Sequence, residues 1–175
     1  MSDSEAGPVP QHAVIVGVIP DQPPRVLKEA ARYAQLFGAP LIVAHVDVTR
    51  FVTYEDPDGY VHSAPIDLDI AVGEAQLASV TAAAASVLDG TGVDWSVRQL
   101  VGDPALAIKQ LAEQSQAQLI VVGTRRRGFG ESIREFFTGS VAARLAHRQS
   151  RPVLVVPLEE PAADDEPLWP HDDAG

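Results

Sequence analysis

Short apolar runs alternate along this chain with longer segments whose apolar residues repeat at helical spacing, and this alternation strongly constrains the fold. The runs at 12–19, 41–48, 118–123 and 152–157 are almost continuously apolar. Strands of that kind are covered on both faces, as in a parallel sheet. Because segments of helical period lie between them, the chain is predicted to form strand-helix-strand units of an α/β fold.

Four helices and one further strand complete the predicted domain. The first helix covers about 26–37, with Asp21 expected to cap it and Gly38 to end it. An alanine-rich helix follows at about 67–88. Asp103 and Pro104 are typical of a helix start, and the last helix covers about 140–147.

Two segments between these elements have a different pattern. The run at 93–101 alternates apolar and polar residues, so it is predicted to be a strand at an edge of the sheet. The connection at 49–65 is expected to be a long loop with a turn at 56–59, because Asp, Pro and Gly gather there. Loops of this length often carry function.

Both ends of the chain are poor in large apolar residues. Segments 1–11 and 158–175 cannot offset their ordering entropy by burial, so we expect two mobile segments around one domain at 12–157. Seven acidic residues in the C-terminal segment contribute much of the net charge of −11. No apolar run approaches the roughly 20 residues of a membrane span, and a signal peptide is not recognised. The absence of cysteine also fits a reducing cytoplasm, where we expect the protein to act away from membranes.

The titratable residues indicate neither a catalytic nor a metal site. The five histidines lack paired metal-ligand spacing, and His45 is expected to be a hydrogen-bonded core residue. Ser140 has no neighbouring base that would activate it as a nucleophile, and a Walker-type Gly-Lys-Ser is absent. The acidic charge and the isolated tryptophans, Trp95 and Trp169, argue against nucleic-acid binding.

The segment from Gly123 to Ser140 is the most informative for function. It joins a buried strand to a helix, which is where open α/β sheets bind ligands. Gly123, Gly128 and Gly130 let backbone approach a ligand, while Gly139 and Ser140 would offer phosphate donors at a helix N-terminus. The alternative is a flexible connection in which Ser140 only caps the helix.

Arginines are concentrated near the end of the domain. Seven of the 13 basic residues are arginines between 125 and 151. They either contact an anionic ligand or lie on solvated surfaces and pair with the acidic C-terminal segment.

Several motifs over about 12–157 together resemble the universal stress protein family. They are Val16-Gly-Val18, Ala44-His-Val46, Gly102-Asp-Pro104, Leu119-Ile-Val-Val-Gly-Thr124, Gly139-Ser140 and Arg151-Pro-Val-Leu-Val-Val156. The resemblance implies a five-stranded parallel sheet of order 3-2-1-4-5 with helices on both faces. It also implies a homodimer through strand 152–157 and, in one branch, ATP or another adenine nucleotide beside strands one and four. The ligand-contacting residues that it implies are Val18, Val46, Val122, Gly123, Thr124, Arg125, Gly128, Gly130, Gly139, Ser140 and Val141.

Two positions depart from the family's nucleotide-binding pattern. Ile19 stands where such members have an Asp that accepts a hydrogen bond from the nucleotide. Arg126 stands where a second glycine is usual, and the interval from Gly123 to Gly139 is three residues longer. The main hypothesis is a non-enzymatic, nucleotide-binding stress-response homodimer. A nucleotide-free dimeric interaction protein is the alternative, and a slow ATP hydrolase ranks third because no general base can be named.

Overall fold

A single parallel sheet organises the molecule. The computed structural model describes residues 7–47, 51–55, 61–65, 70–124 and 141–158. Five strands lie in the order β5-β2-β1-β6-β7 and pair in parallel, which confirms the predicted α/β fold and its 3-2-1-4-5 order. Their bounds are Val14–Val18 for β1, Leu41–Asp47 for β2, Trp95–Val101 for β5, Leu119–Gly123 for β6 and Val153–Val156 for β7.

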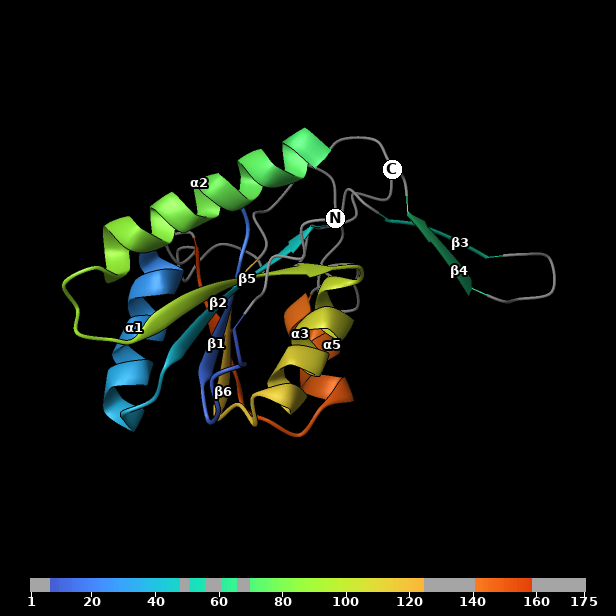
Figure 1. Ribbon diagram of the computed structural model, residues 1–175. Coiled ribbons are helices and arrows are strands. Elements are labelled where there is room, and N and C mark those ends of the chain that lie inside the picture. Colours follow the sequence, from blue (N-terminus) through green and yellow to red (C-terminus); the bar gives the residue numbers. More distant parts are fainter. Residues whose placement is uncertain (1–6, 48–50, 56–60, 66–69, 125–140, 159–175) are drawn as a thin grey trace, which may run out of the picture.

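Helices cover both faces of this sheet. Helices α1 (Arg25–Phe37) and α2 (Ile70–Leu88) lie over one face, while α3 (Pro104–Gln114) and α5 (Val141–Arg148) lie over the other (Figure 1). The predicted edge strand is confirmed as β5, which pairs only with β2 within the described residues and is half-buried along most of its length.

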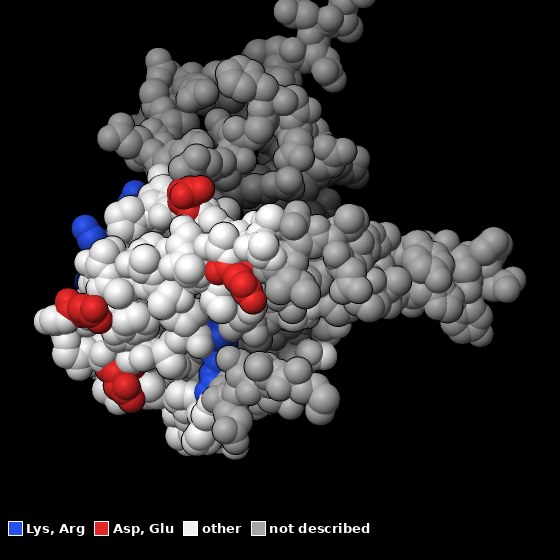
Figure 2. Space-filling view, turned by 45° about the horizontal axis from the view of Figure 1, so that its top comes forward, with Lys and Arg blue, Asp and Glu red and all other residues white. Residues whose placement is uncertain are grey.

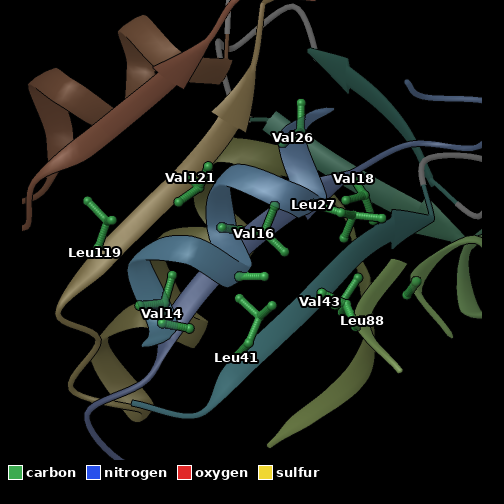
Figure 3. Close-up of a cluster of buried hydrophobic side chains, with 14 of the residues drawn as sticks. Val14, Val16, Val18, Val26, Leu27, Leu41, Val43, Leu88, Leu119 and Val121 are labelled. Atoms are coloured by element: carbon green, nitrogen blue, oxygen red, sulfur yellow. The ribbon is translucent and has the colours of Figure 1, made fainter. Parts of the chain in front are cut away.

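Alternate residues of the strands divide the core into two layers. Val14, Val16 and Val18 of β1 pack toward α1 and α2, together with Leu41 of β2 and Val121 of β6 (Figure 3). Ile15, between them in sequence, packs toward α3 and α5 instead. Because successive strand residues point to opposite faces, the apolar strands supply both layers at once.

The ends of two helices follow the predicted chemistry, and a third does not. Gly38 ends α1 in the left-handed conformation with φ +59°, and the Asp103 carboxylate accepts a hydrogen bond from Leu106 N at 2.9 Å at the start of α3. The prediction that Asp21 caps α1 is wrong. Pro24 occupies the N-cap position without a side-chain cap, and Asp21 itself takes φ +58° three residues earlier. A turn between β1 and α1 therefore places Asp21 outside capping range.

The connection at 49–65 is not simply a loop. It contains an antiparallel pair of strands, β3 (Phe51–Glu55) and β4 (Val61–Pro65), which extends away from the main sheet (Figure 1). Aromatic and β-branched residues on both sides of a turn-forming sequence are typical of a hairpin, and this signal was missed. The expected turn at 56–59 lies outside the described residues, as do the end segments 1–6 and 159–175.

Helix α2 is apolar around most of its circumference. Its residues Ala71–Leu88 are long and apolar enough, by length and composition alone, to cross a membrane, which corrects the expectation that no such stretch exists. The reason is that Glu74 is the only charged residue in this alanine-rich helix. Val80, Ala84 and Leu88 nevertheless pack in the core, so α2 is a helix of the folded domain.

Figure 2, with the top of Figure 1 turned forward, shows scattered acidic side chains on a mostly uncharged surface.

Candidate functional site

A cavity of about 610 Å³ opens at the carboxyl ends of β1, β2 and β6. Strand β1 continues through α1 to β2 on one side, whereas β6 continues to β7 on the other. The strand order thus reverses between β1 and β6, and open α/β sheets bind ligands in the crevice at such a switch point. The described residues that line the cavity are Gly17, Val18, Ile19, Pro20, Gln22, Ala44, His45, Val46, Gln76, Pro104, Ile108, Val122, Gly123, Thr124, Val141, Ala142, Ala143, Ala146, Val155 and Leu158.

Small residues on the sheet leave room for this cavity. Gly17 of β1 borders it on the face that α3 covers, and a Cβ added there would lie 3.1 Å from Ile108 Cδ1 and 3.3 Å from Val122 Cγ1. A larger side chain at 17 would therefore displace Ile108 or Val122. Ala44 of β2 is also small and only 1% exposed.

Helices α3 and α5 form one wall, and an ion pair joins them. Arg144 of α5 donates to both carboxylate oxygens of Asp103 at 2.6 and 2.8 Å, and Asp103 also caps α3. Burial alone would raise the pKa of Asp103, but the hydrogen bonds from Arg144 and the Leu106 N–H, with the Arg144 charge, hold the pKa below its ordinary value. Pro104 and Ala143, next to the paired residues, both line the cavity.

Six of the predicted ligand residues border this one cavity. Val18 comes from β1, Val46 from β2, and Val141 from α5. The other three, at the end of β6 or directly after it, are Val122, Gly123 and Thr124. The remaining five predicted residues, Arg125, Gly128, Gly130, Gly139 and Ser140, lie outside the described residues.

Thr124 has a structural contact as well as its place at the cavity. Its backbone N–H donates to Val156 O at 2.9 Å, and its hydroxyl oxygen accepts from Leu158 N at 3.0 Å. Thr124 therefore holds the chain that leaves β7 beside the end of β6. This brings Leu158 to the cavity, although no sequence pattern marks Leu158 as a site residue.

The polar side chains of the lining are few. The described lining residues include no Asp, Glu, Lys or Arg, and its polar side chains are those of Gln22, His45, Gln76 and Thr124. His45 is 2% exposed, and its Nδ1 lies 3.4 Å from Val18 O, which confirms the predicted hydrogen-bonded core histidine. Its Nε2 has no partner in the described part of the chain. No group of three potential metal ligands occurs among the described residues.

The end of β1 differs most from the sequence expectations. The Ile19 side chain is 64% exposed at the edge of the cavity. The backbone N–H of Ile19 donates to Gln22 Oε1 at 2.9 Å, so the glutamine folds back over the strand end. Gln22 was not predicted as a site residue, because a single glutamine in a turn has no recognisable pattern.

Comparison with known proteins places this architecture in a family. A family model described as the universal stress protein family matches residues 12–157. A universal stress protein of Synechocystis is 37% identical over 68 residues, a match that spans 39% of this chain and 41% of that protein.

Solved structures agree with this match. A universal stress protein from Archaeoglobus fulgidus is 22% identical with a TM-score of 0.62, over 84% of this chain and 94% of the other. A universal stress protein in complex with cAMP is 26% identical with a TM-score of 0.56, over 86% of this chain and 99% of the other. The match of the family model over residues 12–157, with which the sheet order agrees, shows that this chain belongs to the universal stress protein family.

Proposed function

We propose that this protein binds an adenine nucleotide in the cavity at the switch point of its sheet and acts as a stress-response protein without catalysing a reaction. The observation that carries the proposal is that predicted ligand residues from β1, β2, β6 and α5, together with Thr124, border one cavity of about 610 Å³. This volume lies within the roughly 300–1,000 Å³ typical of small-molecule sites. The apolar lining suits a flat base, which can be buried between aliphatic side chains.

The phosphate end of the ligand requires donors from another part of the chain. Because the described lining carries no cationic side chain, we assign the phosphate to Gly139 and Ser140, which directly precede α5 at Val141. Backbone amides at a helix start favour anions. Arg125 and the two arginines that follow it would add positive charge. The relative solved with cAMP supports an adenine nucleotide as the ligand class.

Isothermal titration calorimetry with AMP, ADP, ATP and cAMP tests the proposal. At least one of these should bind, and Ala142→Phe should weaken its binding by about tenfold or more, because the ring would fill space beside α5. Ala82→Phe is the matched control, since Ala82 is an exposed residue of α2 that does not line the cavity. Absence of heat with every nucleotide, or equal effects of both substitutions, would refute the proposed site.

One observation favours the nucleotide-free alternative. Ile19 offers an exposed apolar side chain, not a carboxylate, at the end of β1. In the nucleotide-free alternative, the arginine-rich segment that begins at Arg125 would contact a protein partner, and Ile19 would add an apolar contact. A native mass spectrum of freshly purified protein separates the two functions, because a retained nucleotide adds a defined mass to the subunit.

The outer strand supports a proposal about assembly. Strand β7 pairs only with β6 in the described residues, and the side chain of Val155 at its centre is 44% exposed. An unpaired apolar edge favours pairing with another strand, and a two-fold dimer would cover both copies. We therefore propose a cytoplasmic homodimer formed through 152–157.

A further inference from the structure

The side chain of Gln22 crosses the crevice between the ends of β1 and β6. Its Oε1 accepts a hydrogen bond from Ile19 N at 2.9 Å. At the other end of the carboxamide, an ideal Cβ added to Gly123 would lie 2.7 Å from Gln22 Nε2. The amide is therefore placed beside Gly123 of β6, and a side chain at residue 123 would push the amide out of this position.

The contact with Ile19 determines which end of the amide faces the crevice. A backbone N–H can only donate, so the atom next to it must be the carboxamide oxygen. The Nε2 group then points away from β1 with its N–H donors. It makes no hydrogen bond within the described residues, although the half-buried Gln22 lines the cavity. Among the described residues, the Nε2 of Gln22 is thus an oriented donor without a partner, on a residue that lines the cavity.

We propose that Gln22 is a specificity-determining residue that donates a hydrogen bond from Nε2 to an acceptor atom of the bound nucleotide. This inference rests on the proposed nucleotide-binding function. A carboxylate at position 19, as in the family pattern, accepts hydrogen bonds and therefore selects a ligand that carries a hydrogen-bond donor at this place. Here Ile19 supplies no such acceptor, and the Gln22 donor selects a ligand acceptor at the crevice that AMP and adenosine share, such as a ribose oxygen.

The proposal requires a particular order of affinities among variants. Gln22→Glu keeps the length of the side chain and an oxygen for the Ile19 N–H, but replaces the Nε2 donor by an acceptor. Gln22→Ala removes both groups. If Nε2 donates to the ligand, Gln22→Ala should weaken AMP binding by about two- to tenfold, and Gln22→Glu by more than tenfold, because two acceptors then face each other. If Gln22 only supports the turn, Gln22→Glu should bind like wild type.

Calorimetry with AMP and with uncharged adenosine tests this order, and Gln110→Glu on the exposed face of α3 controls for the added charge. The same order with both ligands supports the proposal. Wild-type affinity in Gln22→Glu, or tighter adenosine binding by that variant, overturns it while leaving nucleotide binding intact. Absence of AMP and adenosine binding to the wild-type protein overturns it too, and calorimetry with the other nucleotides then tests the proposed function itself.

A second measurement does not depend on the binding of any variant. In ¹⁵N NMR spectra, the Gln22 side-chain amide pair is assigned by its disappearance in Gln22→Ala. Saturating AMP should shift one of its two proton resonances downfield, since a new hydrogen bond deshields the donated proton. An unshifted pair in the AMP-saturated protein contradicts the proposal.

Discussion

Asp103 has two structural roles that two substitutions separate. Its carboxylate caps α3 and also binds Arg144 of α5 through two hydrogen bonds. Asp103→Asn keeps a residue that caps as well as Asp, so it removes mainly the ion pair. The two side chains are 31% and 37% exposed, and we therefore expect a loss in unfolding free energy of at most about 1 kcal/mol. Asp103→Ala also removes the cap, which adds about 1 kcal/mol.

The pH dependence of this difference has a definite sign. The pKa of Asp103 in the folded protein is lowered below its ordinary value, because the hydrogen bonds from Arg144 and Leu106 outweigh burial. A lowered carboxyl pKa contributes stability that is fully present above the unfolded pKa, about 3.9, and is lost as the pH falls through the folded value. Wild type should therefore exceed Asp103→Asn in stability at pH 5–8, and the difference should shrink below about pH 4.

Urea unfolding followed by circular dichroism measures both effects. Arg144→Gln is the matched control, since it removes the same ion pair from the other side and leaves the cap. It should resemble Asp103→Asn at pH 7. Equal unfolding free energies of Asp103→Asn and Asp103→Ala would show that the two roles were assigned wrongly. So would a difference in unfolding free energy between wild type and Asp103→Asn that stays the same from pH 7 to pH 3.

Three further substitutions test the fold, the assembly and the cavity. Gly38→Ala should lower the unfolding free energy by about 1–2 kcal/mol, because residue 38 has φ +59°, which is unfavourable for a residue with a Cβ. No atom lies within 4 Å of the added Cβ, so the loss reports the backbone conformation and not a clash. Gly38→Asn should cost less, and equal urea midpoints for wild type and Gly38→Ala would contradict the backbone argument. Val155→Lys should give a folded monomer by light scattering, whereas a wild-type protein already monomeric at micromolar concentration would refute the dimer. Gly17→Val should weaken nucleotide binding by displacing Ile108 or Val122 toward the cavity, and unchanged calorimetric affinity in the folded variant would contradict that geometry.

Local sequence patterns determined most of the fold. Continuous apolar runs predicted the buried strands, because a strand covered on both faces has no need of alternation. Gly38 and the pair Asp103-Pro104 marked helix ends correctly, since left-handed φ and N-capping depend on residues next to one another. The hairpin of β3 and β4 was also within reach of such reasoning, but the turn residues led to a loop being predicted.

The candidate site was predictable where it follows the strand ends. Val18, Val46 and Val122 border one cavity because β2, β1 and β6 are neighbours and run parallel, which brings their carboxyl ends to the same edge of the sheet. The ligand roles of Gly139 and Ser140 stay predictions, as these residues lie outside the described part of the chain.

Only the tertiary structure decided what surrounds those strand ends. The pairing of Arg144 with Asp103 joins residues 41 positions apart, and its geometry depends on how α3 and α5 pack. The turn after β1 places Asp21 away from α1 and directs Gln22 toward Gly123. A carboxamide has no preferred partner in sequence, so its orientation depends on a backbone N–H and on the absence of a side chain at residue 123, which come together only when β1 and β6 pair.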